Sequence, residues 1–324
     1  MYYFIIIYFQ FIIYTNLMSQ QIVMNKSNII NTGNNKIRYK FPRDQQFSAE
    51  DTLAISHFNV YYSWFNISTK YNNNSFSYMW WGTDGVLDQS FDVVIPDGFY
   101  SVSTLYEYFQ RTMVDNGHYL VLKETGDYMY FIELITNSTY YSVEWRLSSL
   151  SQSFDFNDGA GMVDIETKVH KPDALKWKIP SDEDRATPQL VIPSNNNFGS
   201  LIGFNDGSIY QPVPNVDGET YKVDTDQYSF LNDVAPNMEP SSSFIITCNL
   251  VDNDLGIPNN ILYSFTIPNN ITFGDLITSN TDIIYSKIKP GLHSHIDLAI
   301  YDQNWDPLQI IDPNLLIVLS IVKK

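Results

Sequence analysis

The chain has little of what most enzymes and secreted scaffolds depend on. It holds one cysteine in 324 residues, Cys248, which excludes an intrachain disulfide. The apolar neighbours of Cys248, Phe244–Val251, are typical of an inert thiol buried in a strand, and a free thiol favours a reducing compartment. The phosphate-binding loop, the dinucleotide fingerprint, the hydrolase elbow and the zinc helix motif are all absent from the sequence. We therefore expect a protein that is not an enzyme.

Positive charge is also scarce. The sequence has 19 Lys and Arg against 36 Asp and Glu, a formal net charge of -17. Proteins that hold nucleic acid by releasing counterions carry clustered basic residues, and here these residues are outnumbered and dispersed. Direct nucleic-acid binding is therefore not expected, and copies of the chain would need apolar contacts to overcome their mutual repulsion.

Long apolar runs are missing except at the start, Met1–Tyr14. This run is shorter than the roughly 20 residues of a membrane span, so membrane attachment is not expected. It also lacks the basic beginning and the small-residue cleavage site of a signal peptide. Met18 and Met24 are internal alternative starts, so an over-extended gene start stands beside a signal or an anchor. Residues 1–24 are therefore left out of the fold argument, and secretion is expected only if they prove to be a signal peptide.

Aromatic residues are abundant, with 23 Tyr and 20 Phe. From Ile37 onward, short apolar runs alternate with Asn, Asp, Gly and Pro, the spacing of many short strands. The predicted fold is all-β, a jelly-roll-type antiparallel sandwich with an additional β-rich subdomain or long insertion. The expected strands are 54–67, 75–81, 91–95, 119–122, 128–135, 140–147, 244–251, 261–267, 282–287, 294–301 and 315–322.

One short helix is predicted at residues 104–116. Thr104 and Glu107 have the spacing of a capping box, and Leu105, Phe109 and Met113 recur on one face. Asn116-Gly117 supplies a left-handed stop after them. We expect this helix to cover a sheet.

The changes in composition suggest a division of the chain. Residues 37–147 form an N-terminal β-rich part with the helix, and residues 148–195, rich in Ser, Gly and acidic groups, form an excursion or seam. Residues 196–324 then form a C-terminal β-rich part that can complete the same jelly roll.

Candidate ligands for a metal occur at one place. His293, His295 and Asp297 alternate on one face of a predicted strand, and two imidazoles with a carboxylate can bind zinc or iron. No second cluster accompanies them, so we expect no metal, no cofactor and no catalytic residue. Residues 155–159 resemble a calcium loop without its further ligands. The acidic runs 182–184 and 252–254 are interpreted as solvated loops, although an acidic chain always offers carboxylate pairs for glycoside hydrolysis.

Six segments, taken in order, carry a family resemblance. They are Tyr61-Tyr-Ser-Trp-Phe-Asn-Ile67, Ile95-Pro-Asp-Gly-Phe-Tyr100, Asn116-Gly-His-Tyr-Leu120, Tyr128-Met-Tyr-Phe-Ile-Glu-Leu134, Phe198-Gly-Ser-Leu-Ile-Gly-Phe204 and Tyr301-Asp-Gln-Asn-Trp-Asp-Pro307. Their pattern and order resemble the minor capsid, or penton, proteins of Polinton (Maverick) elements and virophage-like viruses, over residues 37–321.

The resemblance implies a structural protein of the virion, assembled inside the host cell. It implies a jelly-roll homopentamer at the fivefold vertices of an icosahedral shell, beside a double jelly-roll major capsid protein. Three other interpretations stay open. One is a major capsid protein of the same lineage. Another is a secreted carbohydrate-binding or adhesion module, for which the N-x-S/T sequons at Asn25, Asn66, Asn73, Asn137 and Asn270 are suitable. The third is a β-sandwich glycosidase.

Overall fold

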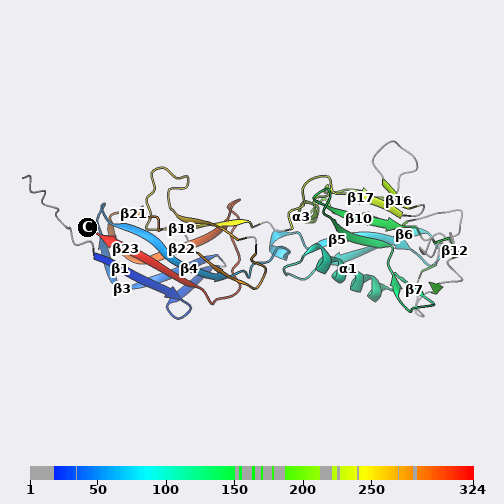
Figure 1. The fold of residues 1–324 in the computed structure, drawn as a ribbon, viewed down its shortest axis with the longest axis horizontal. Coiled ribbons are helices and arrows are strands. Elements are labelled where there is room, and N and C mark those ends of the chain that lie inside the picture. The colour runs from blue at the N-terminus through cyan, green and yellow to red at the C-terminus, as the bar shows by residue number, and fades with distance from the viewer. Residues whose placement is uncertain are drawn as a thin grey trace, which may run out of the picture. The chain divides into compact units, whose positions relative to one another are not determined.

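A computed structural model describes residues 18–33, 35–149, 153–154, 163–164, 169–170, 177–178, 187–211, 221–224, 227–238, 241–268, 270–279 and 283–324. The chain forms two compact units (Figure 1). Unit 1 holds the residues up to Trp64 and those from Ser241 onward, and unit 2 holds the residues between them. Strands dominate both units, which confirms the all-β prediction.

Unit 1 contains two antiparallel sheets of five strands each. Its strands are β1 (Met18–Asn25), β2 (Ile29–Gly33), β3 (Lys36–Phe47), β4 (Thr52–Tyr61), β18 (Ser243–Cys248), β19 (Ile261–Thr266), β20 (Leu276–Thr278), β21 (Ser286–Lys287), β22 (Gly291–Asp302) and β23 (Leu316–Lys323). One sheet has the order β1-β23-β4-β20, with β21 also on β4, and the other has the order β19-β18-β22-β3-β2.

The pairing in unit 1 is nested. Of the eight strands β1, β3, β4, β18, β19, β20, β22 and β23, the first pairs the last and the second pairs the seventh. The third pairs the sixth, and the fourth pairs the fifth. A long antiparallel hairpin folded over on itself gives this pattern, which is the topology of a jelly roll. The predicted jelly roll is therefore confirmed, within unit 1.

The core of unit 1 lies between its two sheets. Alternate residues of β22 are buried, among them Ile296, Leu298 and Ile300, as expected where one face of a strand packs on a core. Phe58 of β4 meets Phe244 of β18 with ring centroids 5.3 Å apart, so aromatic side chains join the two sheets. This contact explains the use of bulky aromatic residues at these inward positions.

The first strand corrects one expectation. Residues 1–24 were set apart from the fold, yet β1 pairs with β23 along its whole length, from Met18 opposite Lys323 to Asn25 opposite Leu316. Met24 is fully buried. The consecutive polar residues Ser19, Gln20 and Gln21, all exposed, hide its strand pattern in the sequence. Strand β1, from Met18 to Asn25, therefore belongs to the jelly roll.

Unit 2 is inserted between the third and fourth strands of the jelly roll, β4 and β18. Its elements are η1 (Thr69–Tyr71), β5 (Ser75–Trp81), β6 (Leu87–Val94), α1 (Val102–Asn116), β7 (Leu120–Leu122), β8 (Tyr128–Met129), β9 (Ile132–Asn137), β10 (Ser142–Ser148), β11 (Ser153–Phe154), β12 (Val163–Asp164), β13 (Val169–His170), β14 (Gln189–Val191), α3 (Phe198–Ile202), β15 (Ile209–Tyr210), β16 (Tyr221–Asp224) and β17 (Gln227–Leu231). The two larger sheets have the orders β15-β14-β5-β6 and β16-β17-β10-β9. The expected insertion is thus present.

Helix α1 packs its predicted face into the core of unit 2. Leu105, Phe109 and Met113 are buried, and the ring of Phe109 contacts the rings of Phe76 and Trp145. The helix begins earlier than predicted, because Ser101 is the N-cap and Thr104 is the third helical residue of the capping box. Gly117, with φ of 72°, ends the helix as expected.

A second helix, α3, was missed. The run Phe198–Gly203 is too short for its 3.6-residue period to be recognised, and two glycines interrupt it. A Cβ on Gly199 would lie 2.5 Å from the carbonyl oxygen of Phe204, so glycine permits this close turn. Phe198 stacks on Phe76, with ring centroids 4.7 Å apart.

The predicted division at 148–195 differs from the structure. The chain leaves unit 1 after Trp64 and returns at Ser241, while the described residues of 148–195 lie within unit 2. Strand β13 pairs with β7, and Trp177 is buried in the core of unit 2. Amino-acid composition can indicate where loops lie. The division into two units instead depends on pairings between strands that are far apart in the sequence.

Candidate functional site

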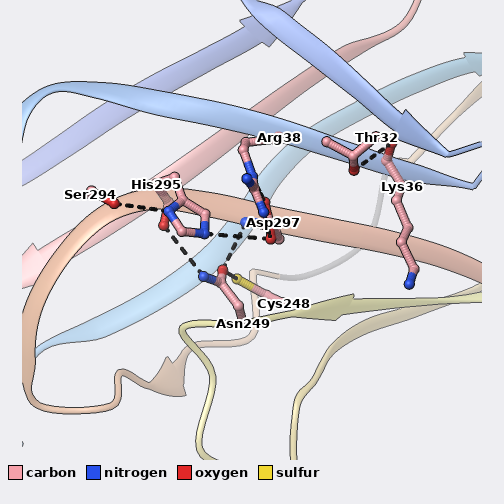
Figure 2. Close-up of polar contacts among 8 residues, drawn as sticks. All are labelled: Thr32, Lys36, Arg38, Cys248, Asn249, Ser294, His295 and Asp297. Atoms are coloured by element: carbon pink, nitrogen blue, oxygen red, sulfur yellow. Dashed lines mark hydrogen bonds and ion pairs between the residues drawn. The ribbon is translucent and has the colours of Figure 1, made fainter.

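The predicted metal ligands lie on β22, in unit 1. Asp297 stands directly opposite Arg38 of β3, and the guanidinium donates to both carboxylate oxygens at 2.6 and 2.7 Å (Figure 2). The hydrogen bonds from Arg38 hold the pKa of Asp297 below its usual value. Each carboxylate oxygen of Asp297 therefore accepts one charge-assisted hydrogen bond from Arg38.

His295 completes this polar cluster. Its Nε2 lies 3.5 Å from Asp297 Oδ2 and its Nδ1 lies 2.9 Å from Ser294 Oγ. Asn249, after β18, accepts a hydrogen bond from the Asp297 backbone amide at 2.8 Å, which ties β22 to the end of β18 (Figure 2). The cluster is therefore a set of polar contacts that connects the neighbouring strands β3, β22 and β18.

His293 has other neighbours. Its Nε2 lies 3.0 Å from the carbonyl oxygen of Lys289. Its ring contacts the ring of Phe47, with the two ring centroids 5.9 Å apart. The pairing of β22 with β3 is interrupted between His293 and His295. Among the described residues, no group of three or more His, Cys, Asp or Glu is arranged to hold a metal ion. The expectation of no metal, with His293, His295 and Asp297 as the candidates, stays a prediction.

Cys248 is buried, as the sequence indicates. Burial raises the pKa of its thiol to about 12, so the thiolate needed for nucleophilic attack is scarce at neutral pH.

Unit 2 holds a hollow that the sequence did not reveal. Its volume is about 630 Å³, and it lies between the turn after β5, strand β6 and the end of α1. The lining residues are Trp81, Gly82, Thr83, Asp84, Asp88, Gln89, Phe91, Val114, Asp115, Asn116, Gly117, His118 and Tyr119. No Lys or Arg is among them.

His118 is one of the residues that line this hollow, although it is an isolated histidine in the sequence. Its Nδ1 lies 2.7 Å from the hydroxyl of Tyr78, and its ring stacks on Trp80 with centroids 4.7 Å apart. Burial lowers the pKa of His118 to about 3, so the imidazole is neutral. A neutral, hydrogen-bonded histidine inside an aromatic cluster is a packing residue.

Two carboxylates, the buried Glu144 and the half-buried Glu133, lie on the sheet of β9 and β10. Glu144 accepts hydrogen bonds from Arg146, Ser229 and Asn137, which outweigh its burial and lower its pKa. Burial of Glu133, opposite Arg146, raises its pKa. The pKa values of Glu133 and Glu144 are shifted in opposite directions, as those of the acid and the base of a glycosidase would be. Neither residue, however, lines any of the main hollows in the described residues.

The first two family segments meet in the structure. Ile67 and Gly98 form a β-bridge, and Asn66 exchanges two hydrogen bonds with the backbone of Tyr100. The backbone amide of Thr69 donates to Asp97 at 2.8 Å. These segments therefore build a junction in unit 2, a structural role that their order in the sequence did not reveal.

Two sequence candidates, the loop 155–159 and the acidic run 182–184, lie outside the described residues. The other acidic run, Asp252–Asp254, opens an exposed loop of unit 1, in accord with a solvated segment. In the part of the chain that the structure describes, no helix has the length and apolar character to cross a bilayer.

Comparisons with known proteins give a structural likeness without a sequence relative. No family model and no curated protein matches the chain. Among solved structures, the mavirus penton protein is 11% identical with a TM-score of 0.40, and the match covers 95% of this chain and 98% of that one. A chain of the Sputnik virophage is 11% identical with a TM-score of 0.37, covering 94% and 98%.

Proposed function

We propose that the chain is a structural subunit of an icosahedral virion, and specifically the penton subunit. It forms a homopentamer at the fivefold vertices, beside a double jelly-roll major capsid protein, and has no catalytic role. The observation that carries the proposal is the nested pairing of eight strands in unit 1, in a chain whose segments resemble penton proteins. Jelly rolls are a recurrent fold of viral capsid subunits.

The topology of unit 2 separates this proposal from a major capsid protein. A double jelly roll needs four nested pairs twice, whereas many strands of unit 2 pair with a neighbour in sequence as hairpins. Examples are β5 with β6, β9 with β10 and β14 with β15. Among the described residues, unit 1 has four nested pairs, whereas unit 2 has three, β5 with β14, β7 with β13 and β11 with β12, and the pairing of β10 with β17 crosses the first two of these.

The sequons argue against a secreted adhesion module. Asn66 and Asn73 are buried, and each side-chain amide donates hydrogen bonds to backbone carbonyls. The amide of Asn137 donates to Glu144 at 2.8 Å. A glycan on these nitrogens would break the contacts, so three of the five sequons are structural asparagines. Assembly inside the host cell agrees with this use.

The test is the solution mass of a chain that starts at Met18, measured by light scattering after size exclusion at two protein concentrations. A mass of five chains supports the penton. A trimer would favour a major capsid protein instead, and a stable monomer at both concentrations would contradict a role in the shell. Mixing a pentamer with a major capsid protein then tests the second partner.

A further inference from the structure

The hollow of unit 2 combines a polar opening with an aromatic interior. Of its lining residues, Asp84, Asp88 and Asp115 are exposed, whereas Trp81 and Tyr119 are buried. Its volume of about 630 Å³ lies within the range of ligand pockets, roughly 300–1,000 Å³. Such pockets place a few polar groups beside aromatic side chains, and the polar groups decide which ligand fits.

Two hydrogen-bond acceptors converge over Gly82, in the turn between β5 and β6. A Cβ on Gly82 would lie 3.1 Å from Asp84 Oδ1 and 3.3 Å from Asp88 Oδ1, so both carboxylates approach this backbone position. The Val86 amide donates to Asp84 Oδ1 at 3.0 Å, which holds that side chain in place. The side chain of Gln89 donates to Asp88 Oδ1 at 2.7 Å. Among the described residues, no donor is bonded to the second oxygen of either carboxylate.

His118 adds a hydrogen-bond donor to the hollow. The Asn116 side-chain amide donates to the Tyr78 hydroxyl at 2.9 Å, and this hydroxyl lies 2.7 Å from His118 Nδ1. Since the hydroxyl already accepts from Asn116, its single proton is directed to Nδ1, which is therefore the acceptor. The proton of the neutral imidazole is then carried by Nε2.

The Nε2–H group of His118 faces the hollow. The side chain is 3% exposed and is part of the lining. Nε2 has no hydrogen-bond partner among the described residues, yet it is not one of their fully buried polar atoms, so this side of the ring is open to the hollow. A ligand that covered this donor without accepting from it would leave it unpaired, which is unfavourable.

These groups disfavour several classes of ligand. Phosphate, sulfate and acidic sugars would be repelled, because three carboxylates and no Lys or Arg line the hollow. A metal ion is not favoured either, since no group of three or more His, Cys, Asp or Glu in the described part of the chain is arranged to hold one. A lysine or arginine side chain would bind the carboxylates, but it has no acceptor for His118 Nε2. A fitting ligand therefore carries donors and acceptors together.

We propose that the hollow of unit 2 binds a neutral saccharide of one or two rings, such as the end of a glycan. Each hydroxyl group both donates and accepts, so one sugar can donate to Asp84 and Asp88 and accept from His118. The C–H groups of the sugar ring pack against the electron-rich faces of aromatic rings, which Phe91 and Tyr119 supply in the lining. This inference goes beyond the penton proposal and does not depend on it, because the site lies within unit 2 of a single chain.

The test is binding of the chain starting at Met18 to an array of immobilised glycans with neutral, sialylated and sulfated ends. We expect binding to neutral ends and none to acidic ones. The free disaccharide that ends the strongest neutral glycan should compete, and isothermal titration calorimetry with that disaccharide gives the affinity. Binding to no neutral glycan, or no competition by the free disaccharide, would overturn the proposal. A capped tri-arginine peptide that binds where no neutral glycan does would identify a cation site instead.

Substitutions then locate the binding. Asp84→Ala combined with Asp88→Ala removes two acceptors and should weaken binding of the disaccharide by at least about tenfold. Asp92→Ala, at an exposed carboxylate of β6 outside the lining, is the matched control and should bind as tightly as the wild type, with unchanged circular dichroism in both variants. Equal affinities of the double variant and the control would overturn the site. A pentamer that binds no saccharide leaves the penton proposal intact, and a monomer that binds one leaves this inference intact.

Discussion

Asn66 and Tyr100 bond to each other reciprocally. The Asn66 side-chain amide donates to the Tyr100 carbonyl at 2.7 Å, and the Tyr100 backbone amide donates to Asn66 Oδ1 at 2.8 Å. The same Asn66 nitrogen also donates to the carbonyl of Met238 at 2.6 Å. One buried side chain thus joins three separate segments of unit 2.

We expect Asn66→Asp to destabilise unit 2 by about 2–4 kcal/mol, because a carboxylate would face two carbonyl oxygens without a donor. Urea unfolding measures the change. Asn270→Asp, at an exposed sequon, is the matched control and should change stability by less than about 0.5 kcal/mol. Equal effects at the two positions would contradict the structural role of Asn66.

The start of the chain gives a second prediction. A protein that starts at Met18 keeps β1 on the edge of its sheet, whereas one that starts at Met24 loses most of that strand and exposes the edge of β23. We expect the Met18 form to be soluble and the Met24 form to melt at lower temperature and to aggregate. Equal melting temperatures in a thermal scan would show that β1 adds nothing to the fold.

Glu133 and Glu144 should respond to substitution in opposite directions. Burial raises the pKa of Glu133 in the folded chain, so its contribution to stability is present below its unfolded pKa and is lost as pH rises through its folded value. Glu133→Gln, which resembles the protonated form, should therefore raise stability at pH 7, on the order of 1 kcal/mol. The gain should vanish at acidic pH.

Glu144→Gln is the companion variant. Burial acts to raise the pKa of Glu144, but hydrogen bonds from Ser229, Arg146 and Asn137 lower it overall. Its contribution is therefore present above the unfolded pKa and is lost as pH falls through the folded value. The substitution should destabilise unit 2 at pH 7 and matter less at acidic pH. Urea unfolding of both variants at pH 7 and pH 4 measures the two trends, and trends of the same sign would contradict the assigned environments.

The sequence predicts local structure well and long-range connections poorly. Strand β5 has the predicted bounds, Ser75–Trp81, and the buried face of α1 is as expected, because periodicity and β-branched or aromatic residues are local signals. The end of β4 was placed too late, at residue 67, because the apolar run continues past Tyr61 into a segment that leaves the sheet.

The insertion of unit 2 and the junction at Asn66 depend on contacts between distant residues. Strand β4 is followed in the jelly roll by β18, which starts at Ser243, and no local pattern reports such a step. The polar cluster was predicted in part, since alternation brings His295 and Asp297 together, whereas Arg38, from another strand, is visible only in the fold.

The last prediction concerns His118, whose buried environment should make the stability of unit 2 depend on pH. Burial lowers its pKa from 6.5 to about 3, so the unfolded chain binds a proton that the folded chain does not. A group of this kind contributes stability above its unfolded pKa and loses it as pH falls toward the folded value. Between pH 7 and pH 5 the loss should be about 2 kcal/mol.

His118→Gln removes this titration, although it also weakens the packing against Trp80 and lowers stability at pH 7. The informative quantity is therefore the slope of stability against pH, measured by urea unfolding between pH 7 and pH 5. The variant should show the shallower slope, because the remaining groups titrate alike in both proteins. Equal slopes would mean that His118 takes up its proton within the folded chain, and would contradict its burial under Trp80 and Tyr78.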